Sequence, residues 1–271
     1  MKIQEYLKNR GGLIDAALDS YLPRDTDYPK AIHRAMRYSV FSGGKRIRPI
    51  LVLASSEACG GKIKEALPVA CAIEMLHTYS LIHDDLPAMD DDDYRRGKLT
   101  CHKKFGEAVG ILAGDALLTF AMELLSRGKN PRVNNEVIRT ITEAIGTYGM
   151  IGGQVVDIEE RAETDLPTLT YINAHKTGAL IAASCKVGGI AAGASDKKVK
   201  ALERYGAYIG FTFQVIDDIL DKEGFALVLG AGGARKEAAR LVERAKQDVK
   251  VFGRKAKALR DLADFLLTRK K

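Results

Sequence analysis

The chain has 271 residues, which is enough for a large core. Its formal net charge of +7 permits nucleic acid, a membrane surface or an anionic metabolite as partner. The four cysteines form no CxxC pair and no histidine stands at zinc-finger spacing, so we expect reduced thiols instead of a disulfide framework or zinc site. We find no apolar run of the roughly 18–20 residues that span a bilayer and no signal-peptide core, and expect a cytoplasmic protein without stable membrane insertion.

Helical periodicity runs through nearly the whole chain. The first segment covers residues 3–18, with Gly11-Gly12 as a point where it could break, and the second, 29–41, stops before Gly43-Gly44. The next two run from Pro49 to Gly60-Gly61 and from Lys62 to Asp85, before Pro87. Later helices are expected near residues 107–128, 133–147, 149–162, 167–174, 178–192, 196–221, 234–250 and 254–269. Strands do not alternate with helices, so one all-α domain over residues 1–271 fits best.

Two aspartate clusters dominate the sequence, and each follows an apolar, helix-like run. The first is HDDLPAMDDDD at 83–93 and the second is QVIDDILD at 214–221. Carboxylates crowded near the end of a helix repel one another and oppose the negative end of the helix dipole, so folding alone does not favour them. Mg²⁺ prefers carboxylate oxygens and keeps positions open for phosphates. The clusters therefore predict a site where metal ions hold a phosphorylated ligand.

Simpler interpretations exist for each cluster taken alone. Residues 90–93 could be a solvated acidic loop, and an isolated His77 is more often a partly buried core histidine. An EF-hand is excluded, because the loop has no Gly at its sixth position and no Glu at its twelfth. His77 lies seven residues before Asp84, so both share a helix face with Ser80 between them, as in a channel wall.

The second cluster has a better-defined geometry. Asp217 and Asp221 are four residues apart and project from one helix face, with Gln214 one turn earlier. A helix surface with partner lysines elsewhere is the alternative for this cluster alone. Two matched clusters, each in an apolar helix, favour a metal site.

Anionic ligands also need cations, and three places supply them. GGKRIRP at 43–49 is a glycine turn that enters a helix with several positive side chains, a pattern that binds phosphate. It is not a P-loop, because the GxxxxGK[ST] spacing is absent. RRG at 95–97 follows the acidic run, and KTG at 176–178 stands at a helix start. Each could be surface charge alone, but together with two metal clusters they indicate diphosphate binding.

These motifs in this order resemble the trans-isoprenyl diphosphate synthases, most closely the bacterial farnesyl diphosphate synthases, over nearly the whole chain. The matching segments are GGKRIRP at 43–49, DDLPAMD at 84–90, RRG at 95–97, AGDALL at 113–118, GGQVVD at 152–157, KTG at 176–178 and FQVIDDILD at 213–221. The resemblance implies an isoprenoid-synthase helical bundle around a deep central cavity, and a homodimer.

The resemblance also implies roles for individual residues. The six carboxylates that would face one another at the cavity mouth are Asp84, Asp85, Asp90, Asp217, Asp218 and Asp221, with Asp84, Asp90 and Asp217 as direct ligands of three Mg²⁺. The residues that would assist the allylic diphosphate are Arg95, Lys176, Thr177 and Gln214. The separate, metal-free site for isopentenyl diphosphate would comprise Lys45, Arg48, His77 and Arg96.

The implied reaction condenses isopentenyl diphosphate with dimethylallyl or geranyl diphosphate. The allylic C–O bond ionises, the isopentenyl double bond attacks, and a proton leaves C2, with the departed pyrophosphate as base. The dipoles of Thr177 and the Lys176 carbonyl would stabilise the cation.

Chain length is set in this family by a bulky residue in the helix before the first aspartate motif. Tyr79 stands five residues before Asp84, about 7.5 Å along the helix. With two extra residues inside the first motif, Tyr79 resembles the floor of the bacterial farnesyl synthases. Ser80 beside it is small, so one ring forms the block. We expect a fifteen-carbon product, with a geranylgeranyl product as the alternative.

One segment departs from the family pattern. After Asp221 the family continues through a longer loop with lysines that close over the diphosphate, whereas here Lys222-Glu223-Gly224 leads directly into Phe225. Either the chain has lost this loop or the sequence omits it, and Lys222 is a weak substitute for the missing lysines.

Three other functions compete with a synthase. A class I terpene cyclase needs no isopentenyl site, so Lys45, Arg48 and Arg96 argue against it. A non-catalytic subunit usually loses the aspartate motifs, which this chain keeps. A nucleic-acid binder would fit the net charge, but no recognised motif supports it.

Overall fold

The computed structural model describes residues 2–160 and 165–269, and the chain is a single all-α domain, as predicted. The elements in chain order are α1 (Ile3–Tyr21), α2 (Lys30–Val40), α3 (Ile47–Cys59), α4 (Ile63–Asp84), β1 (Tyr94–Arg95), β2 (Lys98–Leu99), α5 (Cys101–Phe105), α6 (Glu107–Ser126), α7 (Pro131–Ile145), α8 (Met150–Glu159), α9 (Leu166–Ile172), the π-helix η1 (Asn173–Gly178), α10 (Ala179–Ala191), α11 (Asp196–Asp221), α12 (Gly224–Val228), α13 (Gly230–Asp248), the 3₁₀ helix η2 (Val249–Ala256) and α14 (Lys257–Thr268).

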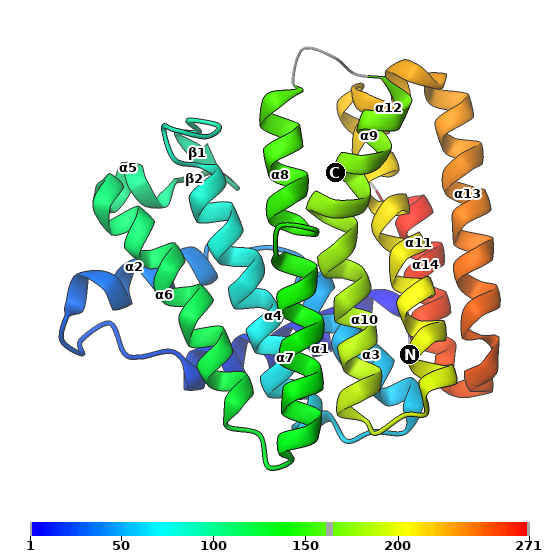
Figure 1. Ribbon diagram of the computed structural model, residues 1–271, viewed down its shortest axis with the longest axis horizontal. Helices are drawn as coiled ribbons and strands as arrows, with labels where there is room; N and C mark the ends of the chain where they lie inside the picture. The colour runs from blue at the N-terminus through cyan, green and yellow to red at the C-terminus, as the bar shows by residue number, and fades with distance from the viewer. Residues whose placement is uncertain (1, 161–164, 270–271) are drawn as a thin grey trace.

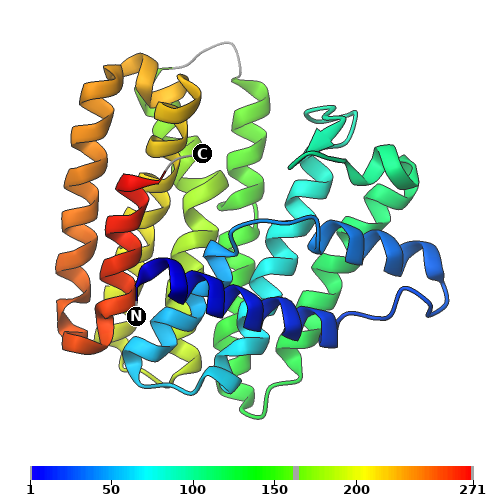
Figure 2. The same ribbon diagram turned by 180° about the vertical axis from the view of Figure 1, so that it is seen from behind.

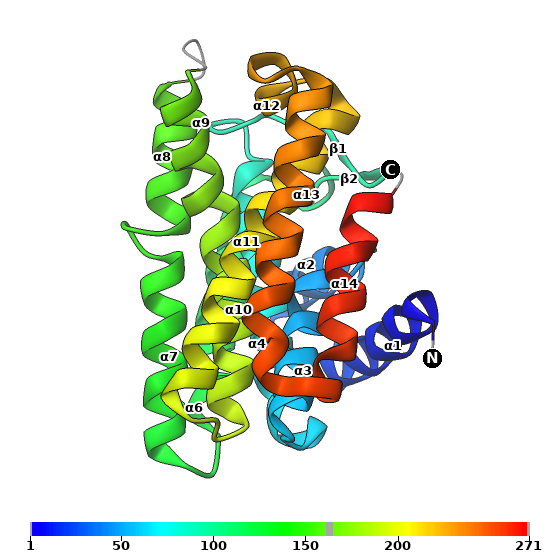
Figure 3. The same ribbon diagram turned by 90° about the vertical axis from the view of Figure 1, so that its right-hand side faces the viewer.

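Long helices form a bundle whose two aspartate-bearing helices end at the same end of the molecule. In Figure 1, the C-terminal ends of α4 and α11 point toward the end that carries the β-hairpin and α12. Helix α4 packs against α3 and α6, and α11 packs against α10 and α13. Figure 2 shows α1 lying across the bundle, and Figure 3 shows α14 rising beside α13 to bring the C-terminus to the aspartate end. This arrangement gathers segments that are far apart in the sequence around one mouth.

The core explains why α4 is so apolar. Its side chains Ala72, Ile73, Met75 and Leu76 are fully buried in the main hydrophobic core of the domain. Helix α3 ends at Cys59, its C-cap Gly60 has a left-handed φ of 84°, and α4 begins at Ile63, three residues after Gly60. The sequence predicted both boundaries correctly.

Several local predictions differ from the structure. Gly11-Gly12 does not interrupt α1, because Tyr6 on one side and Ile14 and Leu18 on the other anchor the helix in the core. That packing offsets the roughly 1 kcal/mol that each glycine costs in a helix interior. The predicted helices near 167–174 and 178–192 are parts of one rod, since η1 joins α9 to α10. The helix expected over 149–162 begins at Met150 and ends at Glu159, and residues 161–162 lie outside the described residues.

The β-hairpin was not predicted. Residues Arg96 and Gly97 connect its two short strands, with φ values of 54° and 75°. Positive φ at both central residues is the signature of a type I′ turn, which suits Gly at the second position. The RRG segment therefore folds back sharply and carries Arg96 toward the bundle mouth.

Helix α6 corrects the expectation that no run is apolar enough to cross a membrane. By length and composition α6 alone, among the helices of the described residues, meets that description. It packs against α4 and α2 in this fold, while Ile111 and Leu112 remain exposed. A partly buried core helix satisfies the same criterion, so the absence of membrane insertion stays a prediction.

Candidate active site

A cavity of about 800 Å³ opens between the C-terminal ends of α4 and α11. Its walls come from the turn before α3, the β-hairpin, η1 and the end of the chain beyond α14. The residues that line it are Ser42, Gly43, Gly44, Lys45, Arg46, Ile47, Arg48, Glu74, His77, Leu81, Asp84, Asp90, Arg95, Arg96, Lys176, Thr177, Phe213, Gln214, Asp217 and Arg269. The structure thus brings most of the predicted site residues together around one space.

The first aspartate motif divides between the cavity and the protein interior. Asp84 and Asp90 line the cavity, and the loop folds back so that the Asp90 N–H donates to the Asp84 carbonyl oxygen at 2.9 Å. Burial, reinforced by Asp90, raises the pKa of Asp84 to about 6 although Lys176 opposes the shift. Asp85 is buried instead and accepts a 2.6 Å hydrogen bond from Arg95 Nε. In this arrangement Asp85 orients Arg95, which lines the cavity.

The second motif divides in the same way. Asp217 lines the cavity, whereas Asp218 is buried and accepts from Gln214 Nε2 at 2.9 Å and from the Phe225 N–H at 2.8 Å. Asp221 is exposed and is not among the cavity-lining residues. Direct metal ligation by Asp85, Asp218 or Asp221 therefore remains a prediction that requires side-chain movement. Lys222 ends α11 with a φ of 62° and does not line the cavity.

The cavity suits hard cations even though the six carboxylates do not converge. Among the residues that the structure describes, no three His, Cys, Asp or Glu side chains form a group close enough to hold a metal. Asp84, Asp90 and Asp217 nevertheless present oxygen donors on one cavity, and the Arg269 guanidinium forms an ion pair with Asp217. A cation from the protein thus already neutralises one carboxylate, and the oxygen donors are of the kind that would hold Mg²⁺.

A cluster of basic side chains lines the same cavity. Arg48 Nη1 lies 3.3 Å from His77 Nε2, and Arg96 Nη1 donates to the Gly43 carbonyl oxygen. Gly44 has a φ of 126°, which favours glycine, and a Cβ there would lie 2.5 Å from Arg96 Nη1, so the guanidinium would have to shift. Burial, and then Arg48, lowers the pKa of His77 well below its usual value, so its ring is neutral at pH 7. These groups and Lys45 form an anion site whose carboxylate neighbour, Glu74, accepts a hydrogen bond from Arg46.

Arg46, unlike Lys45 and Arg48, is engaged in hydrogen bonds within the protein. It is buried and donates to Glu74 at 2.7 Å, to Asp15 at 2.8 Å and to the Val40 carbonyl oxygen at 2.7 Å. Its φ of 51° places it in the left-handed region at the N-cap of α3. Arg46 therefore ties the glycine turn to α1, α2 and α4 and holds Lys45 and Arg48 in place.

The π-helix η1 presents Lys176 and Thr177 to the cavity. Lys176 Nζ donates to Asp157 at 2.6 Å, and Thr177 Oγ1 donates to Gln214 Oε1 at 3.3 Å. A Cβ at Gly153 would lie 2.2 Å from the Lys176 nitrogen, so α8 and η1 are in close contact there. Such a π-helical turn is often found at functional sites, because it redirects side chains and backbone carbonyls.

Sequence reasoning missed four residues of this region. Arg269 enters the cavity from the chain end, and its guanidinium lies 4.1 Å from the Phe213 ring centroid. Asp157 pairs with Lys176, Glu74 pairs with Arg46, and Gln154 has both amide atoms buried without a partner among the described residues. GGQVVD at 152–157 was a visible signal for two of them, but Arg269 was one charge among many in a basic helix.

Tyr79 and Ser80 lie on α4 between the cavity-lining residues His77 and Leu81. Tyr79 is 5% exposed, and its hydroxyl has no hydrogen-bond partner in the described structure. Ser80 Oγ donates to the His77 carbonyl oxygen of its own helix at 2.9 Å. The ring of Tyr79 belongs to the packed core and does not line the cavity, so its role as a chain-length floor stays a prediction.

Comparison with known proteins agrees with this geometry. A family model described as polyprenyl synthetase matches residues 29–234. The chain is 43% identical to a geranylgeranyl diphosphate synthase of Cyanophora paradoxa over 288 aligned positions, covering 97% of this chain and 95% of that protein. It is 44% identical to a farnesyl diphosphate synthase of Geobacillus stearothermophilus over 229 positions, covering 83% and 77%.

A solved structure is similar as well. The apo structure of an FPP/GFPP synthase from Zymomonas mobilis has a TM-score of 0.93 and 38% identity, covering 98% of both chains. The Cyanophora alignment has more positions than this chain has residues, so that relative carries residues without a counterpart here.

Proposed function

The chain belongs to the polyprenyl synthetase family and is a trans-prenyltransferase, and we propose that it makes farnesyl diphosphate from isopentenyl diphosphate and an allylic diphosphate. The observation that carries this proposal is one cavity lined by two unlike groups of side chains. Asp84, Asp90 and Asp217 form a carboxylate wall, and Lys45 with the Arg48–His77 pair forms a cationic wall. Two diphosphates can thus be held by different means in one space.

The carboxylate wall would hold the allylic diphosphate through Mg²⁺, with three ions expected per site. Asp84, Asp90 and Asp217 would be the ligands, and Arg95 and Lys176 would contact the diphosphate oxygens directly. When bound, Mg²⁺ neutralises the charge that develops on the departing pyrophosphate. Arg269 would leave Asp217 when a metal binds there.

Ionisation breaks the allylic C–O bond, and the electron pair leaves with pyrophosphate. Lys176 can release Asp157 to follow the leaving group, because both side chains are partly exposed. The Thr177 hydroxyl and the Gln214 amide oxygen are held together at 3.3 Å near this point. Fixed dipoles of this kind stabilise developing charge at little reorganisation cost.

The cationic wall would bind isopentenyl diphosphate without metal. Lys45, Arg48 and Arg96 would contact its diphosphate, and the neutral His77 ring can donate or accept a hydrogen bond there. The isopentenyl double bond attacks the allylic cation, the new C–C bond forms, and a C2 proton passes to the departed pyrophosphate.

Support for a fifteen-carbon product comes from Tyr79. Its buried ring lies five residues before Asp84 on the same helix, where it would stop a growing hydrocarbon chain. A twenty-carbon product is the second candidate, because Ser80 is small and a geranylgeranyl diphosphate synthase is among the relatives. A terpene cyclase fits less well, because it binds no isopentenyl diphosphate and would not need the cationic wall.

The direct test is product analysis. Protein incubated with isopentenyl and geranyl diphosphates and Mg²⁺ should yield farnesyl diphosphate, identified after dephosphorylation by gas chromatography. Geranylgeranyl diphosphate as the main product would replace the first candidate by the second. Absence of any longer prenyl diphosphate would reject the synthase.

We also propose a homodimer in the cytoplasm that binds no nucleic acid. Exposed apolar side chains on two helices support self-association: Ile111 and Leu112 on α6, and Ile151, Val155 and Ile158 on α8. The four cysteines are unpaired, as expected in a reducing compartment. Light scattering should give twice the chain mass, and Ile111→Asp should shift it to one chain mass.

A further inference from the structure

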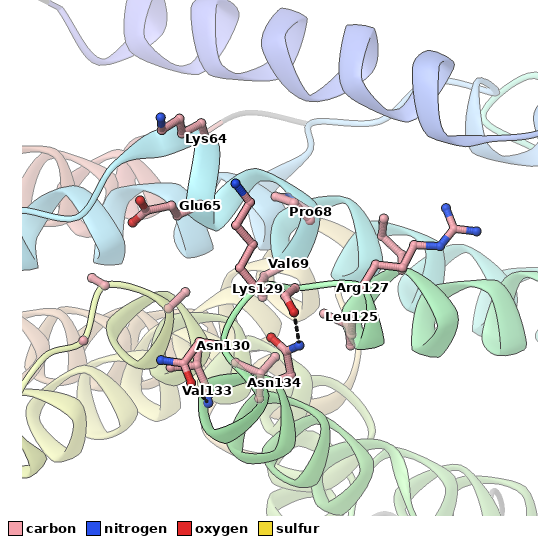
Figure 4. Close-up of a pocket in the computed structure, with 16 residues that line it drawn as sticks. Lys64, Glu65, Pro68, Val69, Leu125, Arg127, Lys129, Asn130, Val133 and Asn134 are labelled. Carbon is pink, nitrogen blue, oxygen red and sulfur yellow. Dashed lines mark hydrogen bonds between the residues drawn. The ribbon is translucent and has the colours of Figure 1, made fainter.

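A second cavity, of about 680 Å³, lies at the opposite end of α4 from the aspartates. The start of α4, the α6–α7 turn, α7 and the end of α10 surround it, as Figure 4 shows for most of the lining residues. Its volume falls within the roughly 300–1,000 Å³ of small-molecule sites. It shares no lining residue with the active-site cavity.

This cavity is separate from the active site. Val69 in its wall precedes Asp84 on α4 by fifteen residues, which corresponds to about 22 Å. Between them, Ala72, Ile73 and Leu76 are completely buried in the core. A molecule in the second cavity must therefore enter from solvent at this end of the bundle.

The lining combines an apolar interior with a basic mouth. Val69, Leu124, Leu125, Val133 and Val137 provide the apolar surface. In Figure 4, the Lys129 side chain extends from the turn toward the first turns of α4, between Glu65 and Pro68. A ligand with a hydrocarbon body and a charged head matches this division.

The side-chain charges favour an anionic head. Lys64 and Lys129 have no ion pair among the described residues, and Glu65 is the one acidic lining residue. Arg127 points away from the cavity and pairs with Glu123. Helix ends of both polarities meet here, since α4 and α7 begin and α6 and α10 end at the cavity, so their dipoles largely cancel.

The turn that carries Lys129 is held in one conformation. The Asn130 side chain accepts from the Arg132 and Val133 N–H groups and caps α7. Asn134 Nδ2 donates to the Gly128 carbonyl oxygen at 2.7 Å and to the Ser126 carbonyl oxygen at 3.3 Å. A Cβ at Gly128 would lie 2.2 Å from Asn134, so this closure needs glycine. The mouth is therefore preorganised before any ligand arrives.

We propose that this cavity binds a prenyl diphosphate, with the hydrocarbon chain against the valines and leucines and the diphosphate against Lys129 and Lys64. The ligand class is the one that a trans-prenyltransferase releases, so the site would sense product. This inference rests on the prenyltransferase activity but not on a fifteen-carbon product.

The experiment is equilibrium dialysis of radiolabelled farnesyl diphosphate in EDTA with excess isopentenyl diphosphate. EDTA removes Mg²⁺-dependent binding at the aspartates, and isopentenyl diphosphate occupies the metal-free site at Lys45, Arg48 and Arg96. The wild-type chain should retain a saturable site. Val133→Trp fills the apolar interior, and the double variant Lys64→Glu/Lys129→Glu reverses the mouth charge. Each should weaken binding about tenfold or more. The matched control is Lys236→Glu/Lys250→Glu, which makes the same charge change at exposed positions and should bind as wild type does.

Three results would overturn the proposal. They are no saturable binding in EDTA, equal affinity in the cavity variants and the control, and binding of uncharged farnesol as tight as that of farnesyl diphosphate. Two differently designed variants guard against a folding defect in either one. Product analysis with Mg²⁺ tests the proposed function separately, because the binding measurement needs no turnover.

Discussion

Replacing Tyr79 by alanine should lengthen the product from fifteen to twenty carbons. The next residue below on that helix face, Met75, lies four positions earlier, about 6 Å along the axis. Removing the ring therefore opens roughly one helical turn of depth, which suits one further five-carbon unit. Because Tyr79 is 5% exposed, the truncation should also cost about 3–5 kcal/mol of stability. That cost is a large share of an ordinary domain stability of about 5–15 kcal/mol.

The matched control is Tyr79→Phe, which keeps the ring and removes only the hydroxyl. That hydroxyl is buried without a partner, so the phenylalanine variant should be as stable as the wild type or more so. Denaturant unfolding measures both stabilities, and chromatography of dephosphorylated products, run at low temperature for the alanine variant, measures chain length. A folded Tyr79→Ala enzyme with the parental product would refute the assignment of Tyr79 as the floor.

Two further predictions concern the charged walls. His77 is buried beside Arg48, and its pKa is lowered. Below about pH 6.5 the unfolded chain therefore binds a proton that the folded chain does not. The free energy of unfolding should then fall by up to about 1.4 kcal/mol per pH unit. Unfolding of His77→Asn across pH 5–7 should lack this component, and an unchanged slope would contradict it. Arg269→Met should tighten Mn²⁺ binding, because no side-chain cation must then leave Asp217. The expected decrease in Kd is about fivefold, which corresponds to an ion pair worth about 1 kcal/mol. Paramagnetic titration would show this, and an unchanged Kd would count against the displacement.

The fold was largely predictable from the sequence, since apolar spacing and glycine boundaries specify helices directly. The boundaries of α3, α4 and α6 follow from Gly60-Gly61, Pro87 and the apolar run after residue 106. The misses occurred where tertiary packing overrides local preference. Buried neighbours keep α1 continuous through Gly11-Gly12, where a break was expected. The close contact between α8 and the backbone of η1 at Gly153 was likewise not expected from the sequence.

The active site, like the fold, was predictable from the sequence only in part. The motifs predicted that Asp84, Lys176 and Asp217 would meet, and the structure places them around one cavity. A motif cannot show that the second aspartate of each pair is used inside the protein. Arg95 engages Asp85, and the Phe225 N–H engages Asp218, through contacts made only after folding.

The most direct test of the magnesium–diphosphate account is the condensation rate of Asp84→Ala and Asp217→Ala with saturating Mg²⁺. Both carboxylates line the cavity, and their loss should slow the reaction by about 10³-fold each while helical circular dichroism stays unchanged. Parental rates in either variant, or wild-type turnover without any divalent ion, would contradict it.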